Sequence, residues 1–443
     1  MFRQPSIVAC LFLCSFLGPA LGQARSADPS GSRARGGGSV LIVGAQVFDG
    51  RRIVGRRDVL IVDGTIRQIS AHIDRVAGIS LVDGTGRTLL PGLIDAHVHT
   101  IPGGAADALR FGVTSEFDLY SFGNRDEAAA RRQHRQSFAR TAEADLWSSG
   151  FGITPPGGHP SELFNGQEGV PPIPVLGPRD DPKKFVAARI ADGADYLKVI
   201  EDDGARVGFP ASLPAFSLPR FAQVMRAAKA SKLRVIVHVQ QLEYAKAAVR
   251  ADANALAHSL ADYPADRELL DAMRRKNVAL IGTLAIYDGI GGGGGAARLL
   301  ADPLIAPYLS PMQKMLLGLG IRTDPREEVV AIETVRRAHR AGITILAGTD
   351  APNPTTGFGV SLLLELQMLV KAGLRPDQAL TAATAAPARF YGANDRGRIA
   401  AGLRGDLVLV DGDPTKNIAD VRRIVAIYKN GWPVDRTVPA SLK

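Results

Sequence analysis

Short runs of apolar residues alternate with polar segments along nearly the whole chain after residue 38. In the central region, stretches with the 3.6-residue period of amphipathic helices separate these runs, for example at 221–231, 269–276, 326–341 and 360–372. The apolar runs that read as strands end near His99, Phe117, Phe151, Ile200, Val239, Ser259, Ala285 and Asp350. Alternating strands and helices predict a parallel sheet, and eight such units predict an α/β fold of the (β/α)8 TIM barrel type.

Both ends of the chain show a different pattern, in which short β-like runs are divided by turn signals. Asp63-Gly64 near the N-terminal end and Asn430-Gly431 near the C-terminal end each adjoin apolar runs, as in β-hairpins. This pattern predicts a small antiparallel sheet. We therefore expect a discontinuous β-sandwich domain from residues 39–90 and 396–443, with the metal-binding barrel, residues 91–395, inserted between its two parts.

The N-terminus has the pattern of a secretory signal peptide: a basic start at Arg3, an apolar run over 7–17 and small residues as far as Ala24. We expect residues 1–24 to be removed and residues 25–38, which end in three glycines, to form a flexible linker. The apolar run is shorter than the ~20 residues that a membrane-spanning helix needs. The mature protein is therefore expected to be exported, to the periplasm or the medium, and to have no membrane anchor.

Composition narrows the function classes. Both cysteines, Cys10 and Cys14, lie in the expected leader, so a cysteine nucleophile and a cysteine-ligated zinc site are excluded from the mature chain. The net charge is +9, yet the Lys and Arg residues are scattered among acidic and apolar neighbours. We therefore expect solvated helix faces and no nucleic-acid partner. The sequence leaves the oligomeric state open, a homo-oligomer included.

Polar side chains close several of the predicted strands. His97 and His99 end the first strand, and residues two apart on a strand point to the same side. His238 and His258 end later apolar runs, and Asp350 ends the last one. A lone histidine in an apolar run is usually a core residue, whereas a buried unpaired carboxylate would be strongly destabilising. All five residues lie at the carboxyl ends of strands, where barrels perform their chemistry.

Lys198 lies inside the apolar run 196–200, where an ammonium group is unexpected. One explanation is a buried ion pair with Glu201 or Asp202. The other is chemical, because burial lowers the pKa of a lysine and frees its amine. A free amine can take up carbon dioxide as a carbamate, and the two carbamate oxygens can bridge two cations.

Together these motifs resemble the amidohydrolase superfamily, specifically its imidazolonepropionase-like and Xaa-Pro-dipeptidase-like branch. The resemblance covers nearly all of the mature chain. In chain order, its motifs are Pro91 to His99, Ala194 to Lys198, Val237-His238, Ala257-His258, Gly348-Thr349-Asp350 and Gly405 to Pro414.

The resemblance implies a metal-dependent hydrolase with two divalent ions, for which zinc fits the ligand types best. The implied ligands are His97, His99 and Asp350 for a buried ion, His238 and His258 for an outer ion, and Lys198, carboxylated by carbon dioxide or bicarbonate, as the bridge. Two ions about 3.5 to 4 Å apart would activate a bridging water to a hydroxide. Asp350 would take its proton and pass it to the leaving amine.

Two further residues are candidates for contact with the substrate. His159 follows the third predicted strand, where the resembling branch often places a histidine near the developing oxyanion. Tyr287, just past the seventh strand, could donate to the same oxyanion. Either residue could equally be an ordinary loop or lid residue. The five glycines from Gly291 to Gly295 predict a flexible loop, which would be a mobile lid or simply slack.

The nearest resemblance is to enzymes that remove a C-terminal amino acid from dipeptides or N-acyl amino acids, including Xaa-Pro dipeptides and the amide of ochratoxin. We therefore expect a small amide substrate with a free carboxylate. Candidate cations for that carboxylate are Arg179, Lys183, Lys184 and Arg206.

Three alternatives stay open at this point. They are hydrolysis of a lactone, cyclic amide or phosphotriester at the same metals, deamination at a single metal, and a secreted binding protein without catalysis. The deaminases use a glutamate shortly after the strand-five histidine, whereas His238 is followed by Val239-Gln240-Gln241-Leu242. That difference, together with Lys198, favours the two-metal hydrolase.

Overall fold

A computed structural model describes residues 37–164, 172–204, 212–320 and 324–440. The expected signal peptide, most of the expected linker and Arg206 lie outside these residues. Within the described ranges, no helix combines the length and the apolar character needed to cross a membrane.

The barrel contains eight short parallel strands, which confirms the predicted α/β architecture. They are β6 (Leu93–Val98), β7 (Val113–Asp118), β8 (Asp145–Ser148), β9 (Leu197–Ile200), β10 (Val235–His238), β11 (Ala255–Ala257), β12 (Ala279–Ile281) and β13 (Ile345–Leu346). The ends of two barrel strands differ from the prediction. The third strand stops at Ser148, before a left-handed turn at Gly150, and the seventh stops at Ile281, because the residues from Leu284 onward are helical.

Regular pairing leaves the barrel strands in two groups, β13-β12-β11-β10-β9 and β6-β7-β8. Two isolated parallel bridges join the groups, one between Val98 and Ala351 and one between Ile153 and Val199. The first bridge places the ends of the first and eighth strands side by side. The carboxyl ends of all eight strands therefore surround one mouth.

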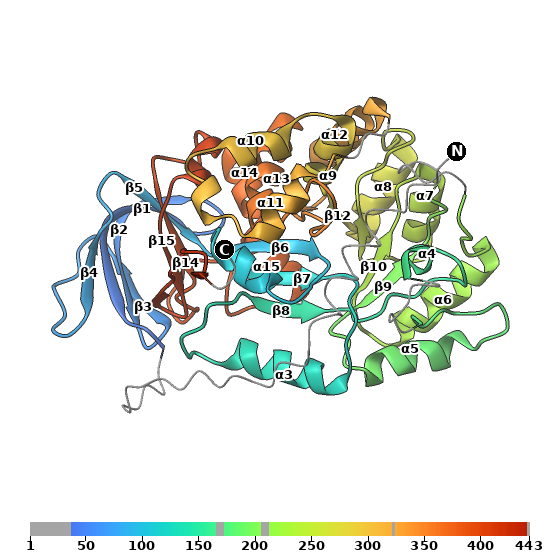
Figure 1. Ribbon diagram of the computed structural model, residues 1–443, viewed down its shortest axis with the longest axis horizontal. Helices are drawn as coiled ribbons and strands as arrows, with labels where there is room; N and C mark the ends of the chain where they lie inside the picture. Colours follow the sequence, from blue (N-terminus) through green and yellow to red (C-terminus); the bar gives the residue numbers. More distant parts are fainter. Residues whose placement is uncertain (1–36, 165–171, 205–211, 321–323, 441–443) are drawn as a thin grey trace.

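Helices cover the outside of the barrel (Figure 1). They are α2 (Gly104–Leu109), α3 (Arg125–Gln136), α5 (Pro182–Ala191), α6 (Leu218–Ala230), α7 (Leu242–Arg250), α8 (Arg267–Lys276), α12 (Pro325–Arg340), α13 (Val360–Lys371), α14 (Pro376–Ala382) and α15 (Ala385–Tyr391), with the short α4 (Ser161–Phe164) in a loop. The four helices that periodicity predicts are α6, α8, α12 and α13. Each buries one apolar face, as α12 does with Ala331, Val335 and Ala338.

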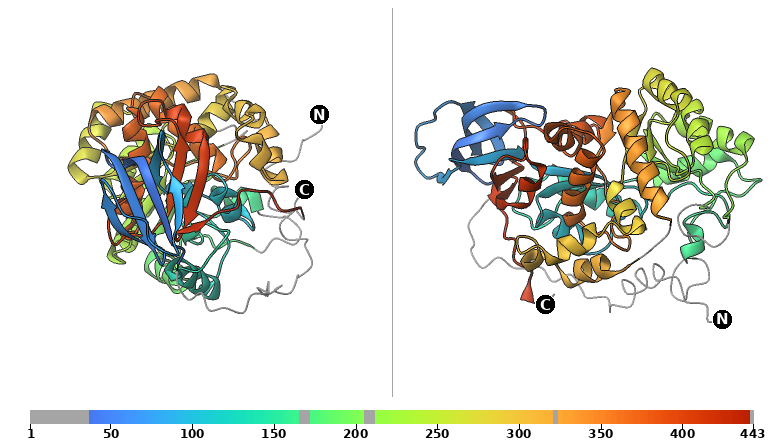
Figure 2. Two further views of the ribbon diagram at one scale, coloured as in Figure 1. Left: turned by 90° about the vertical axis from the view of Figure 1, so that its left-hand side faces the viewer. Right: turned by 90° about the horizontal axis from the view of Figure 1, so that it is seen from above.

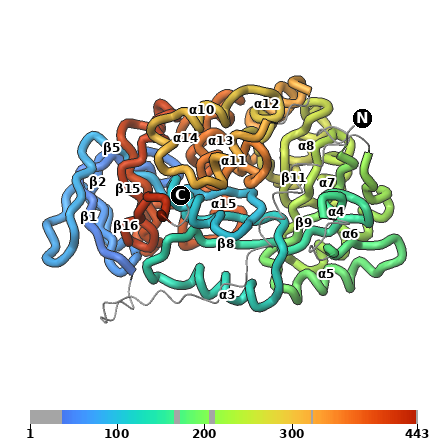
Figure 3. Tube along the Cα trace, viewed as in Figure 1, coloured from blue at the N-terminus to red at the C-terminus, as the bar shows by residue number. Residues whose placement is uncertain are grey.

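A second sheet is built from both ends of the chain. Its strands are β1 (Val40–Phe48), β2 (Ile53–Val62), β3 (Thr65–Ser70), β4 (Ser80–Asp83), β5 (Arg87–Pro91), β14 (Leu407–Asp411), β15 (Ile424–Lys429) and β16 (Trp432–Pro433). N-terminal β5 pairs with C-terminal β14, so the blue and red traces lie side by side in Figure 3 and in the left view of Figure 2.

This second sheet is mixed, whereas the hairpin signals predicted antiparallel pairing alone. β2 occupies one edge of β1, and β4 and β5 share the other edge in parallel with β1. β4 and β5 run in the same direction as β1 because, after the β2–β3 hairpin, the chain crosses back before it returns to β1.

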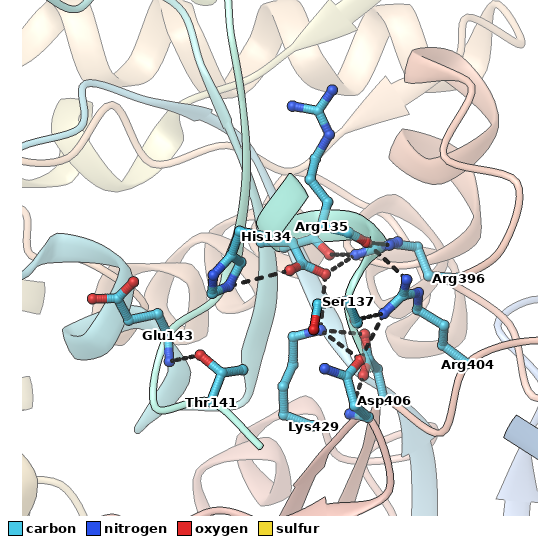
Figure 4. A network of polar contacts seen from close by, with 12 residues as sticks. His134, Arg135, Ser137, Thr141, Glu143, Arg396, Arg404, Asp406 and Lys429 are labelled. Carbon is cyan, nitrogen blue, oxygen red and sulfur yellow. Dashed lines mark hydrogen bonds and ion pairs between the residues drawn. The ribbon is translucent and has the colours of Figure 1, made fainter. Parts of the chain in front are cut away.

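A network of buried charges joins the barrel to this sheet (Figure 4). The Lys429 side chain is 0% exposed, and its Nζ donates to Asp145 at 2.8 Å and to Asp406 at 3.0 Å. Arg396 also pairs with Asp145, the first residue of β8. Burial alone would raise the pKa of Asp145, but the charges of Lys429 and Arg396 outweigh it and lower this pKa.

The glycine run lies between two helices, α9 (Leu284–Gly291) and α10 (Gly295–Ala301). Gly292 and Gly294 have φ of 80° and 74°, in the left-handed region that suits glycine. The Gly295 amide donates to Oδ2 of Asp288 at 2.6 Å, and a Cβ on Gly295 would lie 2.4 Å from that oxygen. Contacts to Asp288 place the run in a close-packed turn between two helices, and its flexibility stays a prediction.

Candidate metal centre

His97, His99 and Asp350 meet at the mouth of the barrel, each offering a ligand atom within 4.8 Å of the others. Oδ1 of Asp350 lies 3.1 Å from Nε2 of His97 and 2.9 Å from Nε2 of His99. The backbone fixes this approach, since the Asp350 amide donates to the carbonyl of His97 at 2.8 Å. Strands one and eight thus supply a His-His-Asp group of the kind that binds divalent metal ions.

Two residues of the cluster have an unusual backbone. Asp350 has φ of 60° and His258 has φ of 77°, both in the left-handed region that non-glycine residues seldom adopt. Asn353 supports Asp350 by donating its side-chain amide to the backbone carbonyl at 2.6 Å and to Oδ2 at 2.9 Å. Such strain persists only where the surroundings enforce it, and it is concentrated at functional sites.

The other predicted histidines continue the cluster as a chain of neighbouring rings. The ring centre of His258 lies 4.7 Å from that of His97 and 4.4 Å from that of His238. His238 in turn lies 5.1 Å from His159. The structure therefore brings together histidines from the first, third, fifth and sixth strand ends.

Lys198 on β9 is only 2% exposed, and its Nζ has no hydrogen-bond partner among the described residues. Asp202 directs its two oxygens to the amides of Gly204 and Gln240. Of the two explanations for Lys198, the ion pair with Glu201 or Asp202 is therefore not seen among the described residues. Burial lowers the pKa of Lys198 to about 7, against the opposing charges of Asp350 and Asp118, so the amine can exist in its neutral form.

Burial also sets the protonation of the ligand candidates. It lowers the pKa of His97 and His238 well below the ordinary value, and that of His258 to about 3. These rings are neutral near pH 7 and keep a nitrogen lone pair for a metal. Burial would raise the pKa of Asp350, but the neighbouring His258, His97 and His99 outweigh it and keep the group a carboxylate.

Hydrogen bonds to neighbouring residues orient the rings of His99 and His258. Nδ1 of His99 lies 3.1 Å from the carbonyl of Tyr120, and Nδ1 of His258 lies 3.0 Å from the hydroxyl of Thr283. A carbonyl can only accept, so Nδ1 of His99 carries a proton and donates it to Tyr120.

The donor set fits a cation. Nε2 of His99 and Oδ1 of Asp350 lie 2.9 Å apart, so a bound cation between them would be coordinated by both atoms. Both ring nitrogens of His97 are buried without a hydrogen bond among the described residues, although Nε2 lies 3.1 Å from Oδ1 of Asp350. Neutral imidazoles and a carboxylate are the donors that zinc and related divalent ions accept.

The two candidates for substrate contact have different surroundings. Nδ1 of His159 lies 2.8 Å from Oε1 of Glu162, three residues further on. Tyr287 is fully buried in the first turn of α9, and its hydroxyl donates to the carbonyl of Ser259 at 2.7 Å. A role for Tyr287 as donor to a substrate therefore requires that this hydrogen bond be exchanged.

Several supporting residues were not anticipated from the sequence. Asp95 accepts from the hydroxyl of Thr349 at 2.7 Å and from the amide of His97 at 3.1 Å, and so ties the first strand to the eighth. Thr283 and Glu162 each hold one histidine ring. Only two had a local signal: Asp95 is a charged residue inside an apolar run, and Glu162 stands three residues after His159.

Comparisons with known proteins agree with this site. Residues 88–434 match the family described as "Amidohydrolase family". Imidazolonepropionase of Rubrobacter xylanophilus is 26% identical over 394 residues, covering 80% of this chain and 83% of the relative. The crystal structure of a Xaa-Pro dipeptidase with bound methionine superposes with a TM-score of 0.70 at 21% identity, covering 90% of this chain and 100% of that one.

A second solved structure, the ochratoxinase of A. niger, superposes with a TM-score of 0.66 at 20% identity, covering 89% of this chain and 95% of that one. At such identities, the structural likeness establishes the fold. The segment matched at the family level contains every barrel strand and the His-His-Asp group. The chain therefore belongs to the amidohydrolase family, and its His-His-Asp group is consistent with the metal site of a metal-dependent hydrolase of that family.

Proposed function

We propose that the protein is a binuclear metallo-amidase of the peptidase type, which cleaves the C–N bond of small N-acyl amino acids or dipeptides. Xaa-Pro dipeptides and ochratoxin-like amides are the representative substrates. The observation that supports two metals over one is Lys198, a buried amine without a partner among the described residues, beside the histidines. When bound, two divalent ions, zinc by the donor types, would polarise the scissile carbonyl and lower the pKa of the attacking water.

The ligands divide between two positions. His97, His99 and Asp350 would hold the buried ion, because they already form one group. His238 and His258, whose ring centres are 4.4 Å apart, would hold the outer ion.

Lys198 would connect the two positions. Its neutral Nζ attacks the carbon of carbon dioxide, an N–C bond forms, and one proton leaves to solvent. A C=O π bond of carbon dioxide breaks as the N–C bond forms, and the resulting carbamate shares one negative charge between two oxygens, which would suit a bridge between cations. The lowered pKa of Lys198 favours this step at neutral pH.

Asp350 would move the proton. Its Oδ2 is held by Asn353, so the carboxylate is oriented while Oδ1 faces the two histidines of the first strand. A carboxylate kept ionised in this position can accept the proton of the attacking water and deliver it to the leaving nitrogen.

His159 would bind the carbonyl oxygen of the substrate. Its ring is oriented by Glu162 through Nδ1, and the ring centre lies 5.1 Å from that of His238, at the edge of the cluster. For the carboxylate of the substrate, we propose the exposed cations at the start of α5, Arg179, Lys183 and Lys184. Helices begin at the mouth of a barrel, which is where the substrate would enter.

A substrate panel tests this proposal. The zinc-loaded protein, supplied with bicarbonate, is assayed against N-acyl amino acids, Xaa-Pro dipeptides, cyclic amides, lactones and phosphotriesters. We expect turnover of the open-chain amides with a free carboxylate, and a large loss when that carboxylate is methylated. Turnover of lactones or phosphotriesters alone would contradict the amidase and leave the metal site intact. A metal-loaded protein inert to the whole panel would favour a binding protein without catalysis.

The second candidate is a cyclic amide substrate. It is favoured by the likeness to imidazolonepropionase, the name of a relative that matches 80% of this chain. The same panel separates the two, because a cyclic amidase would open ring amides and leave Xaa-Pro dipeptides intact.

We also propose that the protein is exported, on the basis of the leader-like residues 1–24. N-terminal sequencing of protein purified from its native host tests this. A product that begins near Gln23 or Arg25 is expected, and an intact Met1 on protein from the cytoplasm would contradict export.

A further inference from the structure

A second concave site lies at the end of the barrel opposite the metal centre. It is a cavity of about 450 Å³, lined by residues 342–345 at the start of β13, by α12, α14 and α15, and by Arg51 of the β1–β2 turn. β13 leads from this cavity to Asp350 at the other end of the strand. The cavity is therefore separated from the metal ligands by the length of the barrel wall.

The cavity has an excess of positive charge. Three guanidinium groups, those of Arg51, Arg375 and Arg389, line it together with one carboxylate, Asp377. Arg375 donates two hydrogen bonds to that carboxylate, at 3.1 Å and 3.0 Å. Arg51 and Arg389 have no ion-pair partner within the part of the chain that the structure describes.

The remaining polar lining consists of groups that can donate hydrogen bonds. His339 and Gln378 interact within the cavity wall, and Thr344 and Thr381 add hydroxyls. Burial lowers the pKa of His339, and the charge of Arg375 lowers it further, which is the effect of a positive local potential.

These donors come from separate elements. Arg51 belongs to the terminal sheet domain, His339 to α12, Arg375 to the start of α14 and Arg389 to α15. The three arginine side chains are exposed, so solvent screens the repulsion among them, and an anion bound in the cavity would gain charge-assisted hydrogen bonds from several elements. A planar guanidinium also pairs with phosphate through two parallel hydrogen bonds, which gives geometric selectivity.

We propose that this cavity binds a small phosphate-bearing anion, either inorganic phosphate or the phosphate group of a small monoester. The volume lies within the range of about 300 to 1,000 Å³ that small-molecule sites occupy. The site joins the terminal sheet to the barrel through Arg51, so its ligand would stabilise the contact between them. This inference does not depend on which bond the metal centre cleaves.

The test is calorimetric titration of the metal-loaded full chain with inorganic phosphate, glycerol phosphate and succinate at constant ionic strength. We expect saturable binding of both phosphates. The double variant Arg51→Gln/Arg389→Gln should bind them at least about tenfold more weakly, because it lacks two charge-assisted contacts. The matched control is Arg267→Gln/Arg274→Gln on α8, which removes the same charge from exposed positions outside the cavity and should bind as the parent does.

Three results would overturn the proposal. Equal weakening in the control would show a general charge effect, and unchanged binding in the cavity variant would place the phosphate at the metals. Succinate binding as tight as phosphate would exclude phosphate selectivity.

Should the Gln variant fail to fold by circular dichroism, Arg51→Lys/Arg389→Lys keeps the charge and removes the bidentate geometry. Its affinity should fall, and unchanged affinity would again contradict the proposal.

Discussion

Nε2 of His99 lies 2.9 Å from Oδ1 of Asp350, although 251 positions separate the two residues. The contact exists because the barrel closes between its first and eighth strands, at the bridge from Val98 to Ala351. An unfolded chain would not hold these ligands together, so metal binding and folding are coupled. The predictions below start from that coupling.

Removal of the metal should abolish activity and lower the melting temperature. A metal at 100 times its Kd stabilises the folded state by about 2.7 kcal/mol. Differential scanning calorimetry before and after chelation measures the effect, and elemental analysis after reconstitution with zinc and bicarbonate should give two ions per chain. One ion per chain would contradict the binuclear site. An unchanged melting temperature would contradict the coupling.

Replacement of Lys198 by Met should lower kcat at least about a hundredfold, because the bridge between the two metal positions is lost. Stability should not fall, since the amine has no hydrogen-bond partner to lose among the described residues. The exposed Lys416→Met is the control for the loss of one positive charge. Full activity in Lys198→Met would end the carbamate hypothesis.

The buried amine also predicts a pH dependence of stability. The pKa of Lys198 in the folded protein is about 7, below its ordinary value of 10.5, so between these values the unfolded state binds more protons. The contribution of this residue to the free energy of unfolding should therefore rise with pH, by at most about 1.4 kcal/mol per pH unit. Urea titrations of the metal-free protein and of the Lys198→Met variant, both in carbon-dioxide-free buffer, give this contribution as the difference between their free energies of unfolding. Identical pH profiles would contradict the lowered pKa.

Glu162→Gln should reduce kcat by about ten- to a hundredfold with little change in KM, because Glu162 orients His159 and is not proposed to touch the substrate. Its melting temperature should be close to that of the parent. The exposed Glu143→Gln serves as the charge-matched control. A change confined to KM, or no change in either constant, would show that Glu162 does not position His159 for the reaction.

Lys429→Met should destabilise the protein by about 3 to 5 kcal/mol, because Asp145 and Asp406 would stay buried without their shared ammonium partner. Equilibrium unfolding in urea measures this loss. Lys416→Met, whose side chain is 82% exposed, should change stability little. A comparably small loss for Lys429→Met would show that Arg396 alone compensates for the charge of Asp145.

The sequence by itself determined the features that depend on local pattern. Strand-helix alternation and helical periodicity determined the barrel and helices such as α12, because apolar spacing specifies which face of each element is buried. The strand-end positions of His97, His238 and His258 were also readable, since the carboxyl ends of parallel strands face one mouth.

Only the tertiary structure decided how these positions combine. The approach of Asp350 to His99, and the parallel pairing of β1 with β5, arise from closure and chain crossing between segments that are remote in sequence. The left-handed backbone of His258 and the hydrogen bond from Tyr287 to Ser259 likewise depend on surrounding packing. A local pattern encodes burial and direction along one element, whereas the order and register of neighbouring elements are set by the closed core that they share.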